Sequence, residues 1–135
     1  DKHLHTYGLG GVTDQPLLVY LGVDSFDSSA FIRSAGKRNY LMPGFGGEPL
    51  SNIDDLAYLH CACAVCSSKS FETIREDRDL LAKHNLWALT LELRRFRYMQ
   101  ASGEDLEAYL DLRFQGNEVT KRAYRMAKQQ VRRLT

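Results

Sequence analysis

Apolar residues recur three or four positions apart in the second half of the chain, which is the spacing of one face of a helix. The longest such run covers residues 80–99, and the positions that carry it are Leu86, Leu89, Leu93 and Phe96. This run predicts a single long helix, which Ser102 and Gly103 should end. A charged helical turn is expected at 71–82, and two further helices at 104–114 and 118–134.

Short apolar runs separated by glycines mark the first half. Residues 4–9 predict a strand, 13–21 a helix with Thr13 as its N-cap, and 23–31 a second strand. A strand, a helix and a strand in this order form a βαβ unit, so the strands should be parallel and the fold class α/β. Residues 33–56 contain six glycines and prolines and predict a long segment with little regular structure.

The bulk composition indicates one globular domain. At 135 residues, with 44% apolar and 26% charged side chains, the chain matches soluble proteins in general. The sequence contains neither a long apolar run nor a signal-peptide pattern, which argues against a membrane span and secretion. Three crowded cysteines favour thiolate ligation over disulfides, and hence a cytoplasmic location. The chain opens on Asp1 and looks like part of a longer polypeptide.

The net charge of +1 hides an asymmetry between the two ends. Residues 1–60 carry four Lys/Arg against seven Asp/Glu, whereas residues 61–135 carry fourteen against ten. The excess gathers at 94–97 and at 121–133, where six basic residues meet no acid. Such stripes suit a phosphate backbone, although a solvated helix face is equally compatible with them. In a third interpretation the arginines brace the fold against nearby acids, namely Asp77, Asp79 and Glu92.

Three thiols spaced Cys-x-Cys-x-x-Cys form the most specific pattern in the chain. Cys61, Cys63 and Cys66 are followed 18 residues later by His84, inside the predicted long helix. Three thiolates and one imidazole are the ligands of a closed tetrahedral zinc site. Because four protein ligands leave no open position, we expect a structural zinc. His60 is the substitute fourth ligand, and buried cysteines without a metal are the other alternative.

Two carboxylates in the second predicted strand suggest where chemistry is done. Asp24 and Asp27 lie three apart, and Asp27 lies where the strand gives way to a loop. In parallel α/β proteins catalytic residues lie at the C-terminal ends of strands, and a carboxylate there can act as nucleophile, general base or metal ligand. The alternative is that Asp27 caps a turn through neighbouring backbone N–H groups.

Five ordered segments carry a family resemblance: HTYGLGG, LGVDSFDSSAF, YLMPG, CACAVC and LLAKHNLW. Together, from residue 3 to residue 98, they resemble the tRNA-guanine transglycosylase family. They are closer to its archaeal, archaeosine-forming branch and its DNA-modifying relatives than to the bacterial queuosine branch. The resemblance implies the C-terminal portion of a TIM (β/α)8 barrel, comprising its last two strands and helices, with an inserted Cys3His zinc-binding subdomain.

The resemblance also implies a division of the chain. Residues 1–32 would hold the last two barrel strands with their connecting helix, and 33–79 the loop and zinc-binding insertion. Residues 80–100 would form the last barrel helix with the ligand His84, and 101–135 a C-terminal helical extension. The remainder of the barrel, on the same or another chain, is then a required partner, because only closure removes the sheet edges.

In function, the resemblance implies a glycosyltransferase (pentosyltransferase) that exchanges a guanine in tRNA or DNA for a 7-deazaguanine base. A covalent Asp–ribosyl intermediate would form on Asp27, after the target nucleotide is flipped out of its stack. Tyr7 and Gly8 match the segment that packs against the base, with a core tyrosine as the alternative for Tyr7. The cations placed to grip phosphates are Arg33, Lys37, Arg38, Arg94 and Arg95.

The chain also departs from the family pattern. The family's general acid/base aspartate lies in earlier strands, outside this sequence, and the interval from Cys66 to His84 is a few residues shorter than expected. A non-catalytic, zinc-stapled nucleic-acid-binding partner subunit is therefore the alternative function. Asp27 favours the enzyme, since a degenerate subunit has no need of it. A homodimer remains open.

Overall fold

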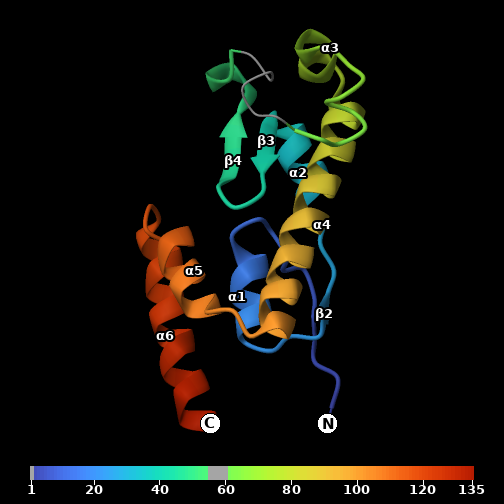
Figure 1. Cartoon of the computed structure of the whole chain (residues 1–135). Helices are drawn as coiled ribbons and strands as arrows, with labels where there is room; N and C mark the ends of the chain where they lie inside the picture. Colours follow the sequence, from blue (N-terminus) through green and yellow to red (C-terminus); the bar gives the residue numbers. More distant parts are fainter. Residues whose placement is uncertain (1, 55–60) are drawn as a thin grey trace.

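One long helix organises the molecule. In the computed structural model, which describes residues 2–54 and 61–135, α4 (Arg78–Ser102) runs along the body, and several of the other elements pack against it at different heights (Figure 1). Asp77 begins the helix by accepting hydrogen bonds from the backbone N–H groups of Asp79 and Leu80. Gly103 ends it in the left-handed conformation, at φ 71°. The predicted helix at 80–99 is confirmed and extended at both ends.

A short parallel sheet lies beside the lower part of α4. Strands β1 (His5–Thr6) and β2 (Ser25–Phe26) pair in parallel, with α1 (Asp14–Tyr20) between them in sequence. The predicted βαβ unit is confirmed, but the second strand was predicted too long. From Ala30 the chain forms a helix, α2 (Ala30–Gly36), and the hydroxyl of Ser28 accepts a hydrogen bond from the Ala30 N–H group at the turn into it.

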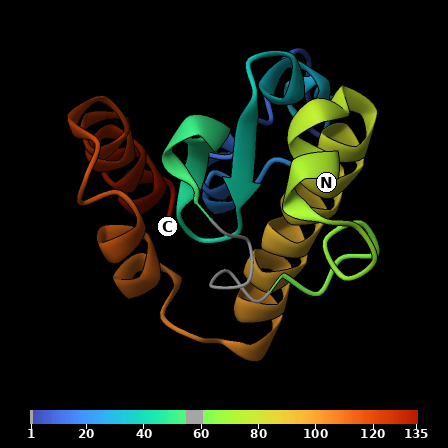
Figure 2. The same ribbon diagram turned by 90° about the horizontal axis from the view of Figure 1, so that it is seen from above.

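The glycine-rich segment folds as a hairpin, so the prediction of little regular structure at 33–56 was wrong. Strands β3 (Asn39–Met42) and β4 (Gly46–Pro49) pair antiparallel, and a 3-10 turn (Leu50–Asn52) follows. The glycines serve the turn, since Gly44 and Gly46 take φ values of 85° and 122° that few other residues adopt. Seen from above, the hairpin lies between α4 and the C-terminal helix pair, α5 (Leu106–Arg113) and α6 (Glu118–Leu134) (Figure 2).

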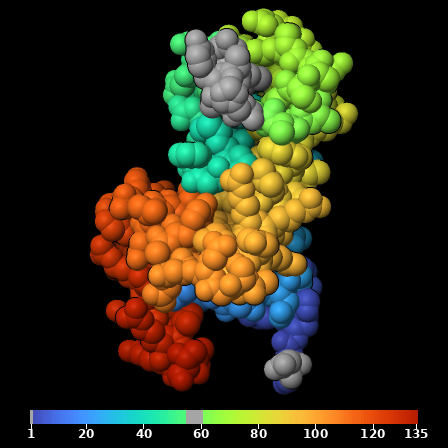
Figure 3. Space-filling model, in the orientation of Figure 1, coloured from blue at the N-terminus to red at the C-terminus, as the bar shows by residue number. Residues whose placement is uncertain are grey.

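Three further helices complete the described chain. The helical turn predicted at 71–82 is α3 (Phe71–Glu76) followed directly by the start of α4. Helices α5 (Leu106–Arg113) and α6 (Glu118–Leu134) form the predicted C-terminal pair. Asn117 begins α6 by accepting a hydrogen bond from the Thr120 N–H group. The last turns of α6 stand out from the body (Figure 3).

Buried side chains form three clusters along α4, and α4 contributes residues to each of them. The upper cluster joins α2, the hairpin, α3 and the first turns of α4; it contains Ala35, Tyr40, Leu50, Ile53, Ile74 and Leu81. A middle cluster is made of Ala30, Leu41, Ala88 and Leu89. The lower cluster joins α1, α5 and α6 to the end of α4; it contains Val19, Phe96, Leu110, Phe114 and Tyr124.

The described part of the chain is therefore α/β and mostly helical. Its parallel sheet has two strands of two residues each, and a sheet this small is not stable by itself. The barrel expected from the resemblance stays a prediction. No helix within 2–54 or 61–135 is long and apolar enough to cross a membrane.

Candidate functional site

The structure brings the three cysteines and the predicted histidine together. The three cysteines, Cys61, Cys63 and Cys66, lie in the segment before α3, and residues 61–66 are called the knuckle from here on. His84 points at them from the second turn of α4. The ligand atoms of the four residues all lie within 4.8 Å of one another. Cys63 and His84 are almost fully buried, at 2% and 1% exposure. The substitute ligand His60 lies outside the described residues.

The spacing of these atoms fits a tetrahedral metal. The Nδ1 atom of His84 lies 3.5 Å from the sulfur of Cys61 and 3.4 Å from the sulfurs of Cys63 and Cys66. With metal–sulfur bonds of about 2.3 Å and metal–nitrogen bonds of about 2.0 Å, a tetrahedral zinc holds sulfur and nitrogen about 3.5 Å apart. One nitrogen cannot hydrogen-bond three sulfurs at once, so shared metal ligation accounts for the arrangement better than hydrogen bonding.

The thiols compete for a single negative charge when no cation lies between them. A hydrogen bond from Cys66 lowers the pKa of Cys61 to about 3, outweighing the effect of burial. The hydrogen bond to Cys61 raises the pKa of Cys66, and burial raises the pKa of Cys63. A divalent cation would remove this competition, because it stabilises all three thiolates together.

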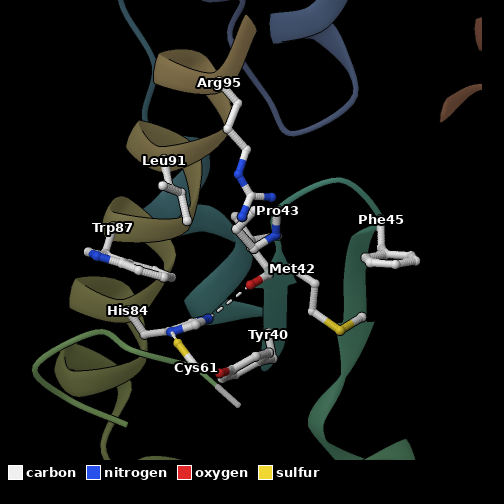
Figure 4. Close-up of a pocket in the computed structure, with 10 residues that line it drawn as sticks. Tyr40, Met42, Pro43, Phe45, Cys61, His84, Trp87, Leu91 and Arg95 are labelled. Atoms are coloured by element: carbon white, nitrogen blue, oxygen red, sulfur yellow. Dashed lines mark hydrogen bonds between the residues drawn. The ribbon is translucent and has the colours of Figure 1, made fainter. Parts of the chain in front are cut away.

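The second nitrogen of His84 fixes the orientation of the ring. Nε2 donates to the backbone carbonyl of Leu41 at 2.9 Å, which leaves Nδ1 free of its proton and aimed at the sulfurs (Figure 4). Tyr40 stacks on the imidazole with ring centroids 3.7 Å apart, and its hydroxyl lies 3.2 Å from the sulfur of Cys66. Such a second shell is typical of metal-binding histidines.

Asn85, the next residue, completes the attachment of the hairpin to α4. Its Oδ1 accepts from the Leu41 N–H group at 2.9 Å, and its Nδ2 donates to the carbonyls of Asn39 at 3.0 Å and Phe31 at 3.3 Å. Together His84 and Asn85 therefore bind both backbone polar groups of Leu41. The imidazole of His84 and the adjacent amide thus hold one strand.

Asp27 lies at the carboxyl end of β2, beside the end of β1. Its Oδ1 accepts a hydrogen bond from the Gly8 N–H group at 2.6 Å, 19 residues away. The local turn is capped by Ser28 instead, so Asp27 is not the cap of its own turn. The two strand ends thus bring together the predicted residues Asp27 and Gly8.

The loop after β1 must come close to β2. A Cβ atom on Gly10 would lie 2.7 Å from the ring of Phe26 and 2.9 Å from the Cβ of Ser28, and φ at Gly10 is 138°. Only glycine fits there without strain. Tyr7, beside this loop, is 82% exposed and meets the ring of His5 edge-on, so the core-tyrosine alternative is wrong.

The predicted phosphate-gripping cations fall into two groups. Three of them are exposed, namely Arg33, Lys37 and Arg94. Arg95 lines a cavity of about 390 Å³ between α4 and the hairpin, and Trp87 lines the same cavity (Figure 4). Two basic residues serve the fold instead: Arg38 donates to the Arg75 carbonyl, and Arg97 to the Asp24 carbonyl.

Glu92 forms an ion pair that the sequence did not predict. The carboxylate is 1% exposed and accepts from the Nε of Arg113 at 3.1 Å, while the same guanidinium donates to the carbonyls of Val12 and Phe45. Burial raises the pKa of Glu92 despite this partner. Asp77 caps α4 and Asp79 pairs with Arg78. Within the described residues, none of these acids pairs with Arg94 or Arg95.

The signal for this pair was present in the sequence. Glu92 lies three residues after Leu89 and four before Phe96, on the buried stripe of α4. A charge at such a position requires a buried partner. Its partner Arg113 comes from another helix, and sequence spacing could not identify it.

Comparison with known proteins points to one group. The chain is 35% identical over 109 residues to the tRNA-guanine(15) transglycosylase of Pyrococcus abyssi, covering 77% of this chain and 18% of that protein. It is 38% identical over 101 residues to the enzyme of that name from Aeropyrum pernix, covering 71% and 19%. The corresponding figures for Haloferax volcanii are 34% over 112 residues, covering 79% and 21%. No protein-family model matches the chain. The chain thus spans about a fifth of the length of these relatives.

Proposed function

The chain is related to the tRNA-guanine transglycosylases, and we propose that it forms part of a guanine transglycosylase that exchanges a guanine in tRNA for a 7-deazaguanine base. In this proposal it supplies the last two strands of a (β/α)8 barrel, the zinc-binding insertion and the last barrel helix. The other strands would come from the remainder of the barrel, on the same or another chain.

The contact between Asp27 and Gly8 carries the proposal. The carboxylate is exposed at the carboxyl end of a parallel strand, where catalytic groups of barrel enzymes lie. One oxygen is held by the Gly8 N–H group at 2.6 Å, which orients the carboxylate. A carboxylate with a fixed orientation and an exposed face suits nucleophilic attack on a sugar carbon.

The reaction would proceed by two displacements at C1′ of the target ribose. An oxygen of Asp27 forms a bond to C1′ while the bond from C1′ to the guanine nitrogen breaks, and guanine leaves with that electron pair. The nitrogen of the incoming base then attacks C1′ and releases the carboxylate, while the proton on that nitrogen passes to a general base outside this chain. The proton on the departing guanine would be supplied by a general acid outside this chain. Tyr7 and Gly8 would lie against the base as it exchanges.

The cysteine–histidine cluster would hold a structural zinc ion. Its four coordination positions would be filled by Cys61, Cys63, Cys66 and His84. The zinc would thereby cross-link the knuckle to α4. This link fixes the hairpin through Leu41, and four protein ligands leave the zinc no open position for a substrate. The zinc therefore supports the fold and does not take part in the exchange.

The polar character of the strand end argues against a non-catalytic partner subunit. A subunit that only binds nucleic acid has no use for an exposed carboxylate tied to the neighbouring strand. As to substrate, tRNA is favoured over DNA because the relatives in Pyrococcus and Aeropyrum carry tRNA in their names.

A base-exchange assay on the full-length protein tests the proposal. Labelled guanine is incubated with tRNA transcripts and, separately, with DNA of matched sequence. Asp27→Asn should reduce incorporation to the background level, because the amide is nearly isosteric but cannot form the ester. Asp24→Asn is the matched control, since its amide oxygen can still accept from the Leu4 N–H group, and it should retain activity. Near-normal exchange by Asp27→Asn would refute the role of Asp27.

A further inference from the structure

The basic residues of α6 divide into those that pair with a carboxylate and those that do not. Lys128 lies 3.0 Å from Asp111 and 3.8 Å from Glu107, and Arg132 lies 3.4 Å from Glu107. At the first turn Lys121 pairs with Glu118 at 3.6 Å. These three cations are partners of carboxylates on α5 or α6, so half of the basic run predicted at 121–133 serves the helix pair itself.

The other three cations, Arg122, Arg125 and Arg133, form what we call the outer ridge. All three are exposed, and among the residues that the structure describes they make neither an ion pair nor a hydrogen bond. At 3.6 residues per turn their positions fall on one face, and the ridge spans about 16 Å along the helix axis. Glu118, the single acid of α6, is already engaged by Lys121.

Hydrogen bonds connect α6, the helix that carries the outer ridge, to α5 and α5 to α1. The hydroxyl of Tyr124 donates to the Glu107 carbonyl at 3.1 Å, and the ring is 2% exposed. Glu107 also accepts from the hydroxyl of Tyr20 in α1 at 2.7 Å. The ridge is thus connected through α5 to the helix that joins β1 and β2, whose ends carry Gly8 and Asp27.

We propose that the outer ridge binds the phosphate backbone of the nucleic acid on which the protein acts, at a surface separate from the strand end. The inference rests on the proposed function for the identity of that nucleic acid. Guanidinium groups bind phosphate oxygens through paired donors and are weakly hydrated, so three exposed, unengaged arginines in a row match a polyanion. One strand carries a charge about every 3.4 Å along its axis, so a ridge of about 16 Å can meet three phosphates.

The same features disfavour an anionic membrane as the partner. A helix that lies in a membrane surface needs a continuous apolar face directed at the lipid. In α6 the apolar face, with Tyr124 and Ala127, is buried against the body. The exposed apolar side chains are Val119, Met126 and Leu134; they lie seven and eight residues apart, two turns from one another, and do not form a continuous face.

Salt-dependent binding to a tRNA transcript tests the proposal in the full-length protein. The outer variant carries Arg122→Gln, Arg125→Gln and Arg133→Gln. Three lost phosphate contacts should lower the slope of log affinity against log salt by about 2 to 3. Between 50 and 200 mM KCl, wild type should therefore lose affinity by about 20- to 40-fold more than the outer variant.

A matched control removes the same charge from the other cations of the helix, with Lys121→Gln, Lys128→Gln and Arg132→Gln. It should lower the melting temperature, because it breaks the pairs with Glu107 and Asp111, and should leave the salt slope close to that of wild type. Equal slopes for the outer variant and wild type, or equal losses in both variants, would overturn the proposal. Binding of wild type to phosphatidylserine vesicles in preference to tRNA would overturn it as well.

Base exchange measured on the same samples separates this inference from the proposed function. If exchange occurs but the outer variant keeps the wild-type slope, the ridge proposal fails and the function stands. If the slope falls as expected but exchange is absent in wild type, the function fails and the ridge stands.

Discussion

Asn85→Ala should destabilise the protein more than any change to an exposed asparagine. The side chain is fully buried and makes three hydrogen bonds to backbone groups of Leu41, Asn39 and Phe31. Its removal leaves one donor and two acceptors without their partner inside the protein. Each such loss costs about 1 to 3 kcal/mol, and the low end applies because water can enter the space that alanine leaves.

The expected cost is therefore about 3 kcal/mol, with the three losses added at about 1 kcal/mol each. This corresponds to more than a hundredfold change in the unfolding equilibrium, since about 1.4 kcal/mol is tenfold. For a chain of this size it lowers the melting temperature by about 10 °C. Urea unfolding of the zinc-loaded protein, followed by circular dichroism, measures the free energy, and the melting curve provides an independent check.

Asn52→Ala is the matched control. Asn52 is exposed, and within the described residues its side chain bonds to the Glu48 side chain alone, at 2.7 Å, so its loss should cost less than about 0.5 kcal/mol. If Asn85→Ala cost no more than Asn52→Ala, the hairpin would not depend on this amide. The contacts of His84 and Asn85 with Leu41 would then not be what holds β3 to α4.

Two further predictions concern the metal and the loop beside the strand ends. Metal analysis of the folded protein should return one zinc per chain, and a folded sample with well under one equivalent would contradict this. A chelator or Cys63→Ser should unfold the knuckle and hairpin, because a structural zinc contributes on the order of 10 kcal/mol to folding. Gly10→Ala should destabilise the protein by about 1 to 3 kcal/mol, because the new Cβ atom would overlap Phe26 and Ser28 and because φ at this position is positive. Gly36→Ala lies in open space within α2 and should be neutral or slightly stabilising. Urea unfolding compares the two variants, and equal effects would refute the steric argument.

Local patterns were sufficient where the structure depends on local rules. The long helix followed from apolar spacing, and Gly103 ends it for the conformational reason that the sequence suggests. The grouping of the three cysteines with His84 followed from chemistry, because three thiols within six residues have few other uses. The parallel pairing of β1 and β2 followed from the order of strand, helix and strand.

The hairpin is the clearest case in which local patterns misled. Its glycines indicated a segment without regular structure, yet β3 is held by contacts from distant parts of the chain. His84 and Asn85 bind Leu41 from 43 and 44 residues away. These bonds offset the weak strand tendency of the segment, and a local reading of 33–56 cannot include them.

By itself, then, the sequence determined the helices other than α2, the βαβ order and the candidate ligand set, because each depends on residue type and short spacing. Only the tertiary structure decided which charges are engaged. Arg97 and Arg113 bind backbone carbonyls, Glu92 takes Arg113 as its partner, and the cations of α6 divide between α5 and solvent. The physical reason is that a charge stripe specifies a helix face, whereas the partner of each charge depends on which other element packs against that face.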